Sequence, residues 1–138
     1  MPERLKIPRQ VLPPGESSYV LVVDDDIDLR ASAVMLLQHE DIKTVGCANA
    51  LEALRVIIDP RHPYPMCIFL DINMPVMTGW DLMATMNCMI DPIKRIPVIL
   101  TTGERLPTNE SRYTVLKKPY TLEQMMAIIN DIRGHGSQ

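Results

Sequence analysis

Short apolar runs, separated by longer stretches of mixed polarity, recur along most of the chain. Runs of this kind, rich in valine, isoleucine and leucine, predict β-strands, and five of them lie at 19–23, 42–47, 66–70, 97–100 and 113–116. The first and third runs are apolar throughout, which indicates strands that are buried on both faces. We therefore expect a parallel sheet with helices on each side, an α/β fold.

The stretches between the runs carry apolar side chains three and four residues apart, which is the spacing of one helix face. Helices are predicted at 26–39, from residue 50, at 79–89 and after residue 121. Asp26 or Asp28 is expected to cap the first helix, Asn49 the second, and Thr121 with Gln124 the last. The side chains expected to face inward are Ile27, Ala31, Val34, Leu37, Ala50, Ala53, Leu54, Ile57, Trp80, Met83, Ala84, Leu122, Met125, Met126 and Ile129.

Two segments lack this alternation. Residues 1–18 hold four prolines and scattered basic side chains, so we expect a flexible leader there, followed by one domain at 19–133 and a tail at 134–138. The stretch between Thr102 and Val115 has no apolar stripe, and a parallel crossover needs about a dozen residues. The helix between the fourth and fifth strands, the fourth helix of such a fold, is therefore expected to be short or absent.

Composition narrows the classes of function. With 138 residues, of which 46% are hydrophobic, the chain can form one domain with a core. A net charge of −3 argues against a nucleic-acid binder, and no apolar run approaches the ~20 residues that span a bilayer. The opening residues lack the apolar centre of a signal peptide. Because Cys47, Cys67 and Cys88 adjoin apolar residues, we expect them in the core of a reduced, cytoplasmic protein.

Polar side chains follow four of the five predicted strands. They are Asp24 and Asp25, Asp71, Thr101 and Thr102, and Lys117 and Lys118. In an open parallel sheet the carboxyl ends of the strands form the ligand-binding edge. Carboxylates that are forced together need a cation between them, and oxygen ligands select a hard ion such as Mg²⁺ or Mn²⁺. Because Mg²⁺ also accepts phosphate oxygens, the pattern favours a phosphoryl group at this edge, held by Lys118 and Thr102. A carboxylate there could also become an aspartyl phosphate.

Four segments of the sequence resemble the receiver domain of two-component response regulators. The matching segments are VLVVDDDIDLR, LDINMPVMTGWDL, PVILTTGE and LKKPYT, which follow one another within residues 19–133. A pair such as DD or KP alone would mean little, but four motifs in order make the resemblance specific. It implies a flavodoxin-like, doubly wound sheet of five parallel strands in the order 2-1-3-4-5.

The resemblance implies a role for each polar side chain at the ligand-binding edge. Asp71 would be the phosphoacceptor and would receive its phosphoryl group from a histidine kinase or a histidine phosphotransfer protein. Asp25 and Asp71 would bind Mg²⁺ directly, Asn73 through its main-chain carbonyl, and Asp24 through water. Lys118 would bind the phosphoryl group. Such a chain is a signalling switch that catalyses its own phosphorylation and dephosphorylation, and no turnover of small molecules is expected.

The resemblance also implies how the phosphoryl state is read and lost. Thr102 matches the switch hydroxyl, and Gly103 matches the small residue that leaves room for the phosphoryl group. Glu104 and Asn73 match the positions that tune hydrolysis, and their polarity predicts a short-lived phosphoryl state. The peptide bond before Pro119 is often cis in this family.

The sequence departs from the family near the switch. Val115 stands where the usual switch aromatic lies, and Tyr113 is two residues earlier. The stretch from Thr102 to Lys118 is also shorter than in typical members. These departures favour an order–disorder change in residues 103–112 as the output, in place of coupling between a threonine and an aromatic ring.

Two other functions stay open at this point. A phosphate-independent receiver would act only as a docking module with the same fold. A phosphatase of the haloacid-dehalogenase type would need a D-x-D motif on Asp24 and Asp26, but Asp28 stands where threonine or valine is expected. A flavodoxin is disfavoured, because acids follow the first strand where a flavin phosphate needs hydroxyl and backbone N–H donors. The sequence names no output partner, and it fits a stand-alone regulator or part of a longer protein.

Overall fold

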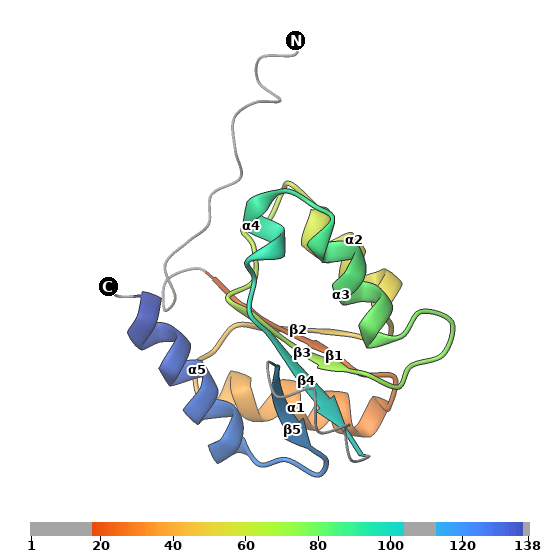
Figure 1. Ribbon diagram of the computed structural model, residues 1–138. Coiled ribbons are helices and arrows are strands. Elements are labelled where there is room, and N and C mark those ends of the chain that lie inside the picture. Colours follow the sequence, from red (N-terminus) through yellow and green to blue (C-terminus); the bar gives the residue numbers. More distant parts are fainter. Residues whose placement is uncertain (1–17, 104–112, 137–138) are drawn as a thin grey trace.

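The structure of the protein is a computed structural model that describes residues 18–103 and 113–136 (Figure 1). Within these residues five parallel strands form one sheet in the order β2-β1-β3-β4-β5. The strands are β1 Val20–Val23, β2 Thr44–Cys47, β3 Cys67–Asp71, β4 Val98–Thr102 and β5 Thr114–Lys117. Each strand overlaps a run predicted from the sequence, and the expected strand order is confirmed.

Helices cover both faces of the sheet, α1 and α5 on one face and α2 and α3 on the other (Figure 1). The helices are α1 Ile27–His39, α2 Ala50–Ile58, α3 Gly79–Asn87, α4 Asp91–Lys94 and α5 Leu122–Gly136. Val20 and Val22 of β1 belong to the core on the α1 and α5 side, whereas Leu21 and Val23 belong to the core on the opposite side. The strand is apolar throughout because both of its faces are buried, as expected.

The register of the sheet brings the polar strand ends to one edge. Val23 of β1 pairs with Leu70 of β3, so the residues that follow them, Asp24 and Asp71, lie at the same level. Thr102 ends β4 and pairs with the last residue of β5. The carboxyl ends of the strands therefore meet at one edge, where a doubly wound sheet binds its ligands.

The helix caps agree with the sequence. Of the two acids expected to cap α1, Asp26 does so, and its Oδ1 accepts two backbone N–H groups at 3.0 and 3.1 Å. The Asn49 Oδ1 accepts a backbone N–H of α2 at 2.8 Å. Thr121 and Gln124 form a reciprocal box at the start of α5, with N–H···O distances of 2.8 and 3.1 Å. Caps depend on residues close in sequence, which explains why they could be predicted.

The predicted buried face of α1 is confirmed at Leu37, which is buried, but it is wrong at Ile27, which is 66% exposed, and at Ala31, which is also exposed. Ala33, which was not predicted to face inward, is the other buried residue of this helix. Val34 is half-buried and packs on the core. The helix carries apolar residues on nearly all sides, so its sequence pattern does not fix which face packs on the sheet.

Two expectations about α3 are also wrong. Ala84 is exposed, and Leu82 and Met86 are buried in its place. Cys88, expected in the core, is exposed, because α3 ends at the residue before it; Cys47 and Cys67 are buried as expected.

A short helix lies where the sequence pattern predicted none. It is α4, which precedes β4 and buries Ile93 against the core. Four residues make barely one turn, too few to show a helical period. The crossover after β4, where a short or absent helix is expected, lies with Glu104 in residues 104–112, outside the described residues.

The expected boundaries meet the described residues only at their ends. Residues 1–17 of the expected leader lie outside them, and Ser18 is buried, with its Oγ donating to the Tyr64 carbonyl oxygen at 3.3 Å. Helix α5 extends to Gly136, into the segment expected to be a tail. Among the helices of the described part, none has the length and apolar character required to cross a bilayer.

Candidate functional site

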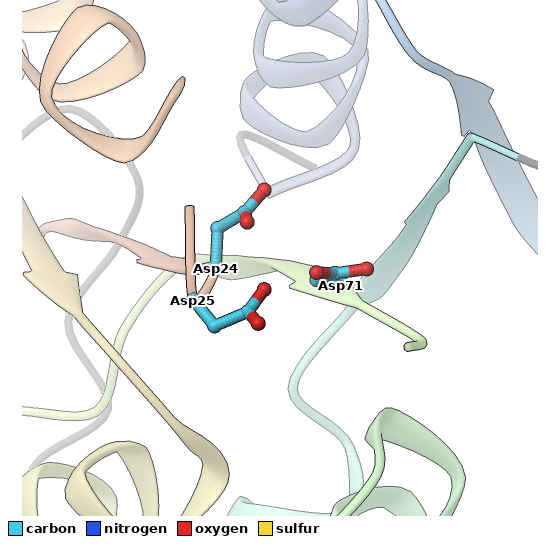
Figure 2. Close-up of side chains that lie close together, drawn as sticks. All are labelled: Asp24, Asp25 and Asp71. Atoms are coloured by element: carbon cyan, nitrogen blue, oxygen red, sulfur yellow. The ribbon is translucent and has the colours of Figure 1, made fainter. Parts of the chain in front are cut away.

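Three carboxylates gather at the ends of β1 and β3. Asp24, Asp25 and Asp71 each offer one oxygen, and these oxygens all lie within 4.8 Å of one another (Figure 2). Asp24 is 1% exposed and Asp71 is 3% exposed, whereas Asp25 is open to solvent. The structure therefore brings together the acids that the sequence placed at the sheet edge, and it leaves one of them accessible.

Asp24 is held by groups from several elements. Its Oδ1 accepts the Asp26 backbone N–H at 2.9 Å, and its Oδ2 lies 2.9 Å from the Lys118 Nζ. Its own N–H donates to the carbonyl oxygen of Cys47 in β2 at 3.1 Å. Its carbonyl oxygen accepts a bond from the Arg30 Nη1 at 2.8 Å. Both the side chain and the backbone of Asp24 are therefore fixed.

Asp71 shares the same lysine. Its Oδ2 lies 3.3 Å from the Lys118 Nζ, and its Oδ1 accepts the Asn73 N–H at 3.1 Å. Burial raises the pKa of Asp71 to about 6, a shift that Lys118 opposes and the charge of Asp24 reinforces. Burial works against the ammonium of Lys118, but the hydrogen bond to Asp24 and the two carboxylate charges outweigh it, so the pKa of Lys118 lies above its ordinary value.

The turn after Asp71 depends on a glycine. A Cβ at Gly79 would lie 2.6 Å from the Asp71 carbonyl oxygen and 2.9 Å from the Ile72 Cα. The Gly79 N–H donates to the Ile72 carbonyl oxygen at 3.0 Å, which closes the loop against the end of β3. The sequence offered Gly79 only as part of the motif; its packing on the backbone of Asp71 became visible only in the structure. In the same loop Val76 is fully exposed and has a φ of 72°.

The strand ends of β4 and β5 complete the edge. Thr102 is buried, and its carbonyl oxygen accepts the Lys118 N–H at 2.7 Å, while Gly103 is exposed. The Lys118–Pro119 peptide bond is cis, as the resemblance implied. Lys117 is exposed. The structure therefore places Thr102 and Lys118 at the edge that carries the carboxylates.

The two residues considered for the switch lie away from that edge. Tyr113 precedes β5 at the opposite end of the strand from the lysines, and its ring packs edge-to-face on Trp80 with centroids 5.7 Å apart. Val115 pairs with Leu100 and packs on the core. Tyr113 is therefore separated from Thr102, which ends β4, by the length of that strand, and Val115 lies level with Leu100, two residues before Thr102.

Tyr120 is a residue near the site that the sequence reasoning missed. Burial raises the pKa of its phenol to about 12, and the charges of Asp24 and Asp71 add to the shift. Tyr120 lines a cavity of about 370 Å³ between α1 and the start of α5, together with Pro119 and Asp28. Its position in the fourth motif, directly after Pro119, was the signal available in the sequence.

Several known proteins are similar to this chain in sequence. Residues 20–130 match the family described as response regulator receiver domain. The transcriptional regulatory protein PrrA of Mycobacterium tuberculosis is 31% identical over 125 residues, which cover 88% of this chain and 52% of that protein. An uncharacterized response regulatory protein of Shewanella oneidensis is 38% identical over 85 residues, 60% of this chain and 33% of that protein. The chain thus spans about a third to a half of the length of these relatives.

Solved structures share the fold. The chemotaxis protein CheY4 of Vibrio cholerae aligns with a TM-score of 0.73 at 24% identity, over 85% of this chain and 99% of that one. The receiver domain of the Francisella response regulator 1452 gives a TM-score of 0.73 at 21% identity, over 86% and 98% of the two chains. Strand order, flanking helices and the family match agree. The chain therefore belongs to the family of response regulator receiver domains of two-component systems.

Proposed function

We propose that the chain is a phosphorylation-dependent switch, with Asp71 as the phosphoacceptor and Mg²⁺ bound beside it. Receiver domains generally bind Mg²⁺ through an acidic pocket and interact with histidine kinases or phosphotransfer proteins. The observation that carries the proposal is the group of three carboxylate oxygens within 4.8 Å of one another, next to the ammonium of Lys118. A cytoplasmic location, expected from the use of cysteine, is part of the same proposal.

The donor set fits a hard divalent cation. Two of the three carboxylates are buried, and the ammonium of Lys118 lies between them. The negative charges of the carboxylates repel one another, and a cation bound between them would reduce this repulsion. Mg²⁺ prefers ligand sets made only of oxygen atoms. Asp25 and Asp71 would hold it directly, Asn73 through its carbonyl oxygen, and Asp24 through water. When bound, Mg²⁺ would supply positive charge beside the phosphoryl oxygens.

The proposed reaction transfers a phosphoryl group from a phosphohistidine to Asp71. A carboxylate oxygen of Asp71 attacks the phosphorus in line, so that an O–P bond forms while the P–N bond breaks and the imidazole leaves with the electron pair. The Asn73 N–H holds this carboxylate in place at 3.1 Å, which favours attack from one orientation. Lys118, 3.3 Å from Asp71, is within reach of the phosphoryl oxygens and would stabilise their charge.

The phosphoryl group would then bias the end of β4. It adds about two negative charges, and the Thr102 hydroxyl at this edge would turn toward it, with exposed Gly103 leaving room. Tyr113 lies at the opposite end of β5 from the carboxylate edge, which supports a switch that does not use its ring. The proposed output segment is 103–112, of which the structure describes Gly103 alone. Hydrolysis by water, tuned by Asn73 and Glu104, would end the phosphoryl state.

Phosphorylation of the purified protein tests the proposal. The full chain is incubated with Mg²⁺ and acetyl phosphate, and intact mass and peptide mapping report the modified residue. We expect phosphorylation at Asp71 in the wild type and in Asp91→Ala, which removes an exposed acid of α4, and none in Asp71→Ala. Beryllofluoride with Mg²⁺ should shift the amide signals of Thr102 and Gly103 in the same two proteins.

The same experiment separates the competing functions. A wild type that is neither phosphorylated nor changed by beryllofluoride would be a docking module that works without phosphate. Sustained release of phosphate from small phosphate esters, lost in Asp24→Ala, would instead indicate a phosphatase of the haloacid-dehalogenase type.

A further inference from the structure

The turn that carries the acidic pair is attached to α1 by one side chain. Arg30, in the first turns of α1, donates from Nη1 to the Asp24 carbonyl oxygen at 2.8 Å. The backbone N–H of Arg30 also donates to the Asp26 carbonyl oxygen at 2.9 Å. Arg30 therefore bonds to the backbone on both sides of Asp25.

Asp25 depends on this turn for its position. It is the exposed member of the three carboxylates. Its neighbours are fixed, because the Asp24 N–H bonds to Cys47, the Asp26 N–H bonds to the Asp24 carboxylate, and the Asp26 side chain caps α1. The bond from Arg30 fixes the carbonyl of Asp24, which belongs to the peptide unit leading directly into Asp25. Loss of that bond would free this peptide unit to rotate and would move the Asp25 carboxylate relative to Asp71.

A glycine in β2 leaves the space that Arg30 occupies. A Cβ at Gly46 would lie 3.2 Å from the Arg30 Cγ, 3.4 Å from its Cδ and 3.1 Å from the Val34 Cγ2. The distances to the Arg30 Cγ and the Val34 Cγ2 are shorter than an ordinary contact between carbon atoms. The stem of Arg30 thus crosses β2 at Gly46 on its way to Asp24, and a Cβ at position 46 would crowd it.

We propose that Arg30 is a positioning residue for the Mg²⁺ site and that Gly46 provides the space for it. This inference rests on the proposed function, because it assigns Arg30 to the cation site formed by Asp24, Asp25 and Asp71. Arg30 touches neither the cation nor the phosphoryl group. It holds the turn so that the carboxylates on β1 face the carboxylate on β3 before the cation binds, which lowers the ordering that binding requires.

Four variants of the full chain separate positioning from packing. Arg30→Met keeps the stem that packs on Gly46 and removes the donor, and Arg30→Lys keeps a donor on a stem of similar length. Gly46→Ala keeps Arg30 and crowds its stem. Ile129→Val is the matched control, because it trims a fully buried residue of α5 that is not part of the turn. For each protein, titration with MgCl₂ followed by amide chemical shifts gives the dissociation constant, and denaturation in chelator gives the stability.

We expect Arg30→Met to weaken Mg²⁺ binding roughly 3- to 10-fold, the equivalent of one lost hydrogen bond. Gly46→Ala should also weaken Mg²⁺ binding, and Arg30→Lys should bind Mg²⁺ more tightly than Arg30→Met does. Ile129→Val should lose stability with an unchanged dissociation constant. In chelator, the Asp26 amide should exchange with solvent faster in Arg30→Met than in the wild type, because its acceptor on Asp24 is less fixed.

The outcomes distinguish this inference from the proposed function. If the wild type binds Mg²⁺ and Arg30→Met binds it equally well while losing stability, Arg30 is only a packing residue and the inference is overturned. If the wild type itself shows no Mg²⁺ binding, the proposed function fails and the positioning role fails with it. Weakened binding in Arg30→Met with partial recovery in Arg30→Lys supports the inference.

Discussion

Replacing Asp71 with asparagine removes a buried charge and changes the size of the side chain very little. In the protein without metal, the Asp71 carboxylate lies close to that of Asp24, and Lys118 pairs with both. The pKa of Asp71 is raised from 3.8 to about 6, first by burial and then by the charge of Asp24. A raised pKa means that the folded state disfavours the ionised carboxylate, so we expect Asp71→Asn to stabilise the metal-free protein at neutral pH.

The size of the effect follows from linkage. A shift of one pKa unit corresponds to about 1.4 kcal/mol, and the rise from 3.8 to about 6 therefore sets an upper limit of about 3 kcal/mol. Because the charges of Lys118 and Asp24 both act on Asp71, part of this energy belongs to the interaction among these groups and not to Asp71 alone. We expect a gain of about 1–2 kcal/mol in the free energy of unfolding above pH 7.

The sign of the pH dependence is fixed by the direction of the shift. Between pH 3.8 and about 6 the folded state binds more protons at Asp71 than the unfolded state does, so the wild type loses stability as pH rises through this window. Below pH 3.8 Asp71 becomes protonated in both the folded and the unfolded protein, so the difference between the wild type and Asp71→Asn should disappear.

Urea denaturation of the wild type and Asp71→Asn at pH 4 and pH 7.5 measures the gain in stability and its dependence on pH. Each measurement is made once with chelator and once with Mg²⁺. At 100 times its dissociation constant, Mg²⁺ should stabilise the wild type by about 2.7 kcal/mol at pH 7.5, and it should stabilise Asp71→Asn much less. Asp91→Asn, which removes an exposed acid of α4, should match the wild type in stability at both pH values and in its stabilisation by Mg²⁺. A lower stability of metal-free Asp71→Asn at pH 7.5, or an equal effect of the substitution at both pH values, would show that the Asp71 charge does not destabilise the fold.

Four other substitutions test particular contacts. Val76→Gly should raise the free energy of unfolding by about 1 kcal/mol, since a left-handed valine is strained by about 1–2 kcal/mol; a loss of stability in urea denaturation would contradict this. Lys118→Met removes the ammonium that pairs with two buried carboxylates and should lower the free energy of unfolding by about 3 kcal/mol in chelator. Mg²⁺ should restore much of this stability. An equal loss of stability in chelator and in Mg²⁺ would argue against a Mg²⁺ site. Gly79→Ala, whose Cβ would meet backbone atoms, should cost at least about 2 kcal/mol. Gly103→Ala, whose Cβ would have no neighbour within 4 Å among the described residues, should cost little. Similar thermal midpoints for these two variants would show that the loop at Gly79 can relax.

Much of the fold could be read from the chain because its signals are local. The apolar runs located all five described strands, and the caps of α1, α2 and α5 were found because their donors and acceptors lie within three residues. The convergence of Asp24 and Asp71 was also predictable, since parallel strands end at one edge whatever packs on their faces. The buried face of α1 could not be predicted in full, because a helix that is apolar on nearly all sides shows no clear hydrophobic period.

The sequence alone determined the α/β class, the strand ends that carry the chemistry, and the family motifs that name Asp71. Tertiary structure alone decided how these groups act on one another. The pairing of Lys118 with two carboxylates and the crossing of Arg30 over Gly46 each join segments distant in the chain. The packing of Gly79 against the Asp71 backbone depends on how the loop after β3 folds back on the strand. Burial and the nearby charges of Lys118 and Asp24 set the pKa of Asp71, and both effects arise only after the strands have brought these segments together.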